Sequence, residues 1–80
     1  MTFGERVRRL QSMRKNLKQL INDKESWNDN RPEMPLDVGW EKTMRHYVEK
    51  QLEALDNANA DEAMHWQAKM DEHVKTIQEV

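Results

Sequence analysis

Apolar residues recur at intervals of three and four in three separate stretches of the chain, and this spacing limits the fold more than any other feature. On an α-helix, residues at such intervals share one face, which is buried by packing against another helix. The chain is therefore predicted to be all-α, as a small antiparallel three-helix bundle in up-down-up order. The first stretch contains Phe3, Val7, Leu10, Leu17 and Ile21, the second Trp40, Met44, Tyr47, Val48, Leu52 and Leu55, and the third Ala63, Trp66, Met70, Val74 and Ile77.

Polar residues indicate where each helix begins. Thr2 with Glu5, and Asn59 with Glu62, have the spacing of a capping box, in which two side chains bond to free amides at a helix start. Asp37 is a good N-cap for the second helix.

These signals give one helical domain over residues 1–80, with helices over about 3–25, 38–56 and 60–80. Nothing between Asp56 and Ala60 excludes a helix on steric grounds. One unbroken helix from Asp37 to Val80 is therefore the alternative to a helical hairpin.

The predicted loop, residues 26–36, is long and rich in residues that resist helix formation, including two prolines. Its apolar residues suggest that it packs back on the helices, and long loops often carry binding residues. Trp27, Arg31 and Met34 are therefore the candidate partner-binding residues. Trp27 has two interpretations, as an anchor for the loop or as an exposed contact residue.

Size and composition limit the core of the protein and argue against disulfide bonds and a membrane span. Eighty residues allow only a small core, so a dimer that buries more apolar surface is a second expectation. The chain has no cysteine, which fits a reducing compartment such as the cytoplasm, and no apolar stretch near the roughly 20 residues of a membrane span.

Charge is strongly polarised along the chain. Seven of the thirteen basic residues lie between positions 6 and 24, whereas the last third of the chain is acidic. This basic face could pair with the acidic third helix of the same chain, with an acidic protein partner or with nucleic acid. Its residues are Arg6, Arg8, Arg9, Arg14, Lys15 and Lys18.

Chemistry-bearing motifs are scarce. Glu62 and His65 have the E-x-x-H spacing that di-iron bundles use, but such bundles need a second copy of the motif on another helix. Glu62 and His65 are the candidate metal ligands, although histidines exposed or half-buried on a helix are the simpler interpretation. Cysteine nucleophiles and phosphate-binding glycine loops are absent from the sequence. We expect no cofactor and no enzymatic activity.

These observations favour a small protein–protein interaction module, such as an adaptor, inhibitor or accessory subunit. It would bind through a polar helical surface and the 26–36 loop. The alternatives are a nucleic-acid-binding accessory protein that uses the basic face and a structural helical homo-oligomer.

Overall fold

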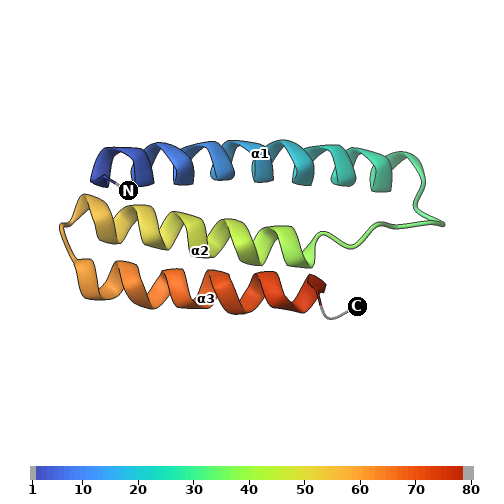
Figure 1. The fold of residues 1–80 in the computed structure, drawn as a ribbon. Coiled ribbons are helices and arrows are strands. Elements are labelled where there is room, and N and C mark those ends of the chain that lie inside the picture. The colour runs from blue at the N-terminus through green and yellow to red at the C-terminus, as the bar shows by residue number, and fades with distance from the viewer. Residues whose placement is uncertain (1, 79–80) are drawn as a thin grey trace.

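The computed structural model describes residues 2–78, with side chains described for residues 2–76. Within this range the chain forms α1 (Phe3–Asn30), α2 (Gly39–Asp56) and α3 (Ala60–Gln78), which run up, down and up (Figure 1). The predicted all-α three-helix bundle is confirmed. No helix in the described range is both long and apolar enough to cross a lipid bilayer.

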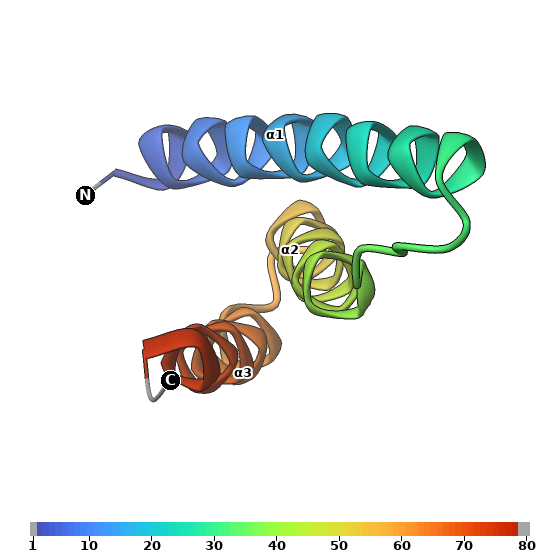
Figure 2. The same cartoon turned by 90° about the vertical axis from the view of Figure 1, so that its right-hand side faces the viewer.

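The three helices are arranged as layers with α2 in the middle. Both α1 and α3 pack on α2, and α1 crosses it obliquely, while no Cα atom of α1 comes within 8 Å of one of α3 in the described range (Figure 2). Among the described side chains no ion pair joins the basic residues of α1 to α3, although Arg6 and Arg9 line one groove with Asp71 of α3. The middle helix, α2, separates the two outer helices and leaves this groove open.

The core comes from the three predicted apolar stretches. Two residues of these stretches depart from the pattern, because Phe3 at the start of α1 is 62% exposed and Val74 on α3 is 37% exposed. The side chain of Ile77 lies outside the described range. The buried apolar residues are Leu10, Leu17 and Ile21 from α1, Met44, Val48, Ala54 and Leu55 from α2, and Ala63 and Met70 from α3.

The first helix is longer than predicted and ends at Asn30 rather than near residue 25. Its last backbone hydrogen bond runs from the Arg31 N–H to the Trp27 carbonyl, at 2.9 Å. Pro32 then stops the helix, because proline disfavours helical geometry in the residue before it, and Arg31 has an extended φ of −138°. Trp27 therefore lies in α1 and not in a loop.

The second helix begins at Gly39, one residue later than predicted, so its N-cap is Val38 and not Asp37. The Val38 side chain makes no capping hydrogen bond. Asp37 still serves the helix start, because its Oδ1 accepts a hydrogen bond from the Gly39 N–H at 2.9 Å.

A tight turn separates α2 from α3, so the prediction of a hairpin is confirmed and the unbroken helix is wrong. The amides of Ala58 and Asn59 donate to the carbonyls of Leu55 and Ala54, at 3.1 and 2.8 Å, which is the Schellman arrangement. Ala58 takes the left-handed conformation that this motif requires, with φ of 55°. Asn59 then accepts from the Glu62 amide at 3.1 Å and starts α3, as predicted.

Candidate functional site

The end of α1 and the following segment form a compact cluster around Trp27. The indole Nε1 of Trp27 donates to the Met34 carbonyl at 3.2 Å. The Arg31 guanidinium lies over the indole, 4.1 Å from the ring centroid, in a cation–π contact. The three candidate partner-binding residues are thus brought together, and Trp27 anchors the segment as well as contributing to its surface.

Asn28 fixes the same segment from the next position of α1. Its side-chain amide donates to the Leu36 carbonyl at 2.9 Å and accepts from the Leu36 amide at 2.6 Å. Two reciprocal bonds to one residue hold the backbone as a neighbouring β-strand would. The segment is therefore ordered by α1 before any partner binds.

Much of the apolar surface of this cluster faces solvent. Met34 is 65% exposed, Leu36 43% and Trp27 37%. We call the surface formed by Trp27, Arg31, Met34 and Leu36 the Trp27 patch. It combines an aromatic ring, a guanidinium and flexible apolar side chains, which are common at binding interfaces.

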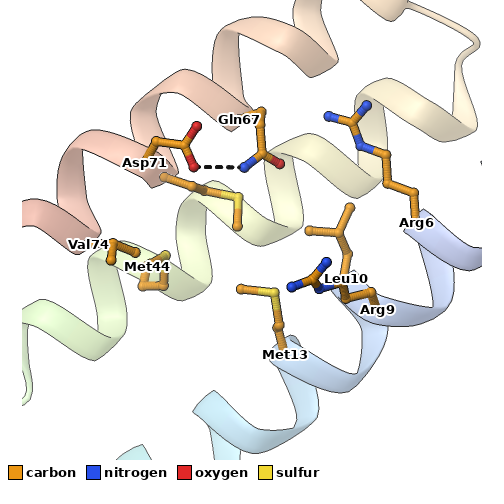
Figure 3. A pocket seen from close by; sticks show the side chains of 9 residues that line it. Arg6, Arg9, Leu10, Met13, Met44, Gln67, Asp71 and Val74 are labelled. Atoms are coloured by element: carbon orange, nitrogen blue, oxygen red, sulfur yellow. Dashed lines mark hydrogen bonds between the residues drawn. The ribbon is translucent and has the colours of Figure 1, made fainter. Parts of the chain in front are cut away.

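A groove of about 490 Å³ lies between α1 and α3, and α2 runs behind it as its floor (Figure 3). Its interior is apolar and rich in methionine, and its edges are polar. Arg6, Arg9, Leu10 and Met13 line it from α1, Met44 from α2, and Gln67, Met70, Asp71 and Val74 from α3.

A chain of hydrogen bonds connects the basic and acidic sides of the groove through α2. Because a guanidinium can only donate, we assign the fully buried Gln51 amide with its oxygen toward Arg6, whose Nη2 and Nε then donate to it at 2.7 and 3.1 Å. The amide Nε2 of Gln51 donates to Gln67 Oε1 at 3.2 Å, and Gln67 Nε2 donates to Asp71 Oδ1 at 3.0 Å. We call this chain the amide relay. It couples Arg6 on α1 to Asp71 on α3 through Gln51 and Gln67.

The remaining residues of the predicted basic face are not paired with any acid within residues 2–76. Among the described side chains, ion pairs join Lys24 to Glu41, Lys42 to Glu25 and Lys50 to Glu53. Arg8, Arg9, Lys15 and Lys18 are exposed on α1, and Arg14 is half-buried beside a shallow hollow that Glu49, Glu53 and Asp56 also line.

One ion pair between α1 and α2 is partly buried. Lys24 Nζ lies 2.6 Å from Glu41 Oε1, and the two side chains are 28% and 9% exposed. Glu41 Oε2 is buried and has no hydrogen-bond partner among the described residues. Lys24 is therefore the group that compensates the buried Glu41 charge.

The three histidines belong to an aromatic cluster between α2 and α3. His73 stacks on Trp40 with ring centroids 4.7 Å apart, and His46 meets Trp66 edge to face at 5.9 Å. The Trp40 Nε1 donates to the His73 carbonyl at 3.1 Å, and the His73 Nε2 lies 2.9 Å from the Trp40 carbonyl, to which it donates. This reciprocal contact ties the start of α2 to the end of α3.

The candidate metal ligands take part in the helix start and in this cluster. Glu62 Oε2 accepts from the Asn59 side-chain amide at 3.1 Å, and Glu62 Oε1 faces the Trp66 Nε1 at 3.5 Å. His65 packs against the Trp66 ring, with centroids 5.0 Å apart. Within residues 2–76, no three side chains of the ligand types His, Cys, Asp and Glu come together.

Sequence reasoning grouped Trp27, Arg31 and Met34, three of the four residues of the Trp27 patch, but missed Leu36 and the amide relay. Gln51 gave a usable signal, because it follows Met44 and Val48 at helical spacing on the stretch that becomes core. A polar residue in such a position must find a buried partner. The identity of its partners, Arg6 and Gln67, depends on how the helices pack.

No protein-family model, curated protein or solved structure matches this chain.

Proposed function

We propose that this protein is a small non-catalytic interaction module, an adaptor, inhibitor or accessory subunit that binds another protein through the Trp27 patch. The observation that carries the proposal is that Trp27 is held by three contacts and is still 37% exposed. A rigid, half-exposed tryptophan contributes contact area with little loss of side-chain entropy on binding. The absence of cysteine fits action in the cytoplasm.

The groove supports a structural rather than a catalytic role for its polar groups. Arg6, Gln67 and Asp71 are engaged in the amide relay, and most of the other lining side chains are apolar. Groups that already satisfy one another are not free to transfer protons or hold a reacting atom.

The test compares two methionines of equal exposure. Met34 in the Trp27 patch and Met64 on α3 are both 65% exposed. Tagged wild-type protein, Met34→Glu and Met64→Glu are used to capture proteins from nuclease-treated lysate of the source cells. We expect one stoichiometric partner with the wild type and Met64→Glu, and loss of that partner with Met34→Glu and with Arg31→Ala.

Equal capture by all variants would refute the assignment of the patch. Circular dichroism of each variant controls for folding, because both methionines are exposed and neither substitution should change helicity.

A second candidate function rests on the exposed basic residues of α1 that pair with no acid of the described part of the chain. Arg8 and Lys15 are seven residues apart and lie on the side of the helix opposite the buried Leu10 and Leu17. Such a row could follow a phosphate backbone, with affinity that falls steeply as salt increases. Binding of a labelled duplex at low salt, lost in Arg8→Ala/Lys15→Ala, would favour this function, and no binding at low salt would exclude it.

A further inference from the structure

The groove side of α1 presents a row of residues that no other helix of the described chain covers. Arg9 and Met13 line the groove, and the same side of the helix continues through Asn16 and Leu20 to Asp23, at intervals of three and four. We call these five residues the α1 flank. In a closed bundle α3 would cover such a row, but in the described range the backbones of α1 and α3 stay more than 8 Å apart between Cα atoms, with the groove between them.

The centre of the α1 flank is apolar and accessible. Leu20 is 42% exposed, and Met13 is half-buried at the edge of the core. The outer positions carry opposite charges on exposed side chains, Arg9 near one end and Asp23 near the other. Two apolar residues between opposite charges match, on a short scale, the apolar seam with charged flanks of paired helices.

The pattern of the flank is self-complementary. Asn16 lies at its middle, with Arg9 seven residues before it and Asp23 seven residues after it. When a second copy of the helix is laid antiparallel with the two Asn16 residues opposed, each Arg9 lies opposite an Asp23. In this register position 13 of one copy lies opposite position 19 of the other, so each Met13 lies next to a Leu20 of the second copy.

We propose that two copies of this chain associate through the α1 flank, antiparallel and about a twofold axis near Asn16. The occupant of the open side of α1 is thus a second copy, and the charge pattern is the reason for choosing it over an unrelated helix. The half of the flank that carries Leu20 and Asp23 enters the partner's groove beside Met13 and Arg9. Because the same patch is used by both copies, the contact closes as a dimer.

The proposal goes beyond the binding of another protein at the Trp27 patch and does not depend on it. Its variants change only Arg9 and Asp23 and leave Trp27, Arg31 and Met34 intact. Loss of the dimer and loss of partner capture are therefore separate results.

The test is a charge reversal with rescue, read by sedimentation equilibrium from micromolar to sub-millimolar concentration. Arg9→Glu alone places a second carboxylate opposite Asp23, and Asp23→Arg alone places two cations opposite each other. We expect each single variant to dimerise about tenfold more weakly than the wild type, since every dimer contains two such contacts. An equimolar mixture of the two variants has only opposite charges in contact, and we expect it to form a heterodimer with wild-type affinity.

Rescue in the mixture cannot arise within one chain. Arg9 and Asp23 are fourteen residues apart on a continuous helix, which separates them by about 21 Å. The double variant Arg9→Glu/Asp23→Arg should likewise dimerise as the wild type does. A wild type that stays monomeric at every concentration, single variants that dimerise normally, or a mixture that stays monomeric would each overturn the proposal.

Discussion

Gln51 occupies a position in the middle layer that an apolar residue would normally fill, and its amide touches side chains from both outer helices. A buried amide is tolerated only where its donors and acceptors are satisfied. Arg6 supplies both donors to the Gln51 oxygen, so removal of Arg6 would leave that buried oxygen without a hydrogen-bond donor.

Arg6→Ala should lower the free energy of unfolding by about 1–3 kcal/mol, because it leaves the buried Gln51 oxygen without its donors. Arg8→Ala is the matched control, since Arg8 is exposed two residues away on α1 and makes no ion pair with a described residue. Urea unfolding followed by circular dichroism measures both. Equal effects of the two substitutions would contradict the role given to the amide relay.

The two ion pairs between α1 and α2 offer a second comparison at the residue scale. Lys24→Met should destabilise the fold by about 2 kcal/mol, because Glu41 then keeps a buried charge without compensation. This is below the value for a fully buried pair, since Lys24 is 28% exposed. Lys42→Met breaks a pair whose side chains are 50% and 48% exposed, and should cost less than about 0.5 kcal/mol.

The double variant Lys24→Met/Glu41→Leu extends this test. It removes both charges and should recover most of the lost stability, because an apolar pair has no charge to desolvate. Thermal unfolding of the single and double variants would detect the recovery. A double variant less stable than Lys24→Met would show that Glu41 contributes by some route other than its pairing.

At the scale of elements, the turn between α2 and α3 depends on one residue in an unfavourable backbone conformation. Ala58 has φ of 55°, where its Cβ is crowded and glycine is not. Ala58→Gly should therefore raise the free energy of unfolding by about 0.5–1 kcal/mol. Ala68→Gly, at an exposed position inside α3, should lower it by a similar amount, about 0.5–1 kcal/mol. The opposite signs, measured by thermal unfolding, are the test.

The elements themselves were largely predictable from sequence, because their signals are local. The Thr2–Glu5 capping box is present, with the Glu5 amide 3.2 Å from the Thr2 hydroxyl oxygen. The end of α1 lies beyond the predicted one because residues 26–30, which include Asn28 and have low helix propensity, are nevertheless helical. The Asn28 side chain bonds to Leu36, and this distant contact favours the longer helix.

The arrangement of the whole molecule was less predictable than its parts. Three apolar stretches indicate three packed helices, but they do not give the angle at which α1 crosses α2. That angle keeps α1 away from α3 and leaves the groove open. Trp27, Arg31 and Met34 could be grouped from sequence because they are neighbours in the chain, whereas the relay joins residues from three helices.

The central position of α2 has a consequence for how the molecule opens. Loss of α1 would still leave α2 packed on α3, and loss of α3 would leave α2 packed on α1, so α2 is the last helix to lose its neighbours. Backbone amides exchange with deuterated solvent when their hydrogen bonds open. We therefore expect amides in the middle of α2, around Val48 and Gln51, to exchange more slowly than any in α1 or α3. Slower exchange in either outer helix would show that the pair of helices containing it forms the more persistent unit.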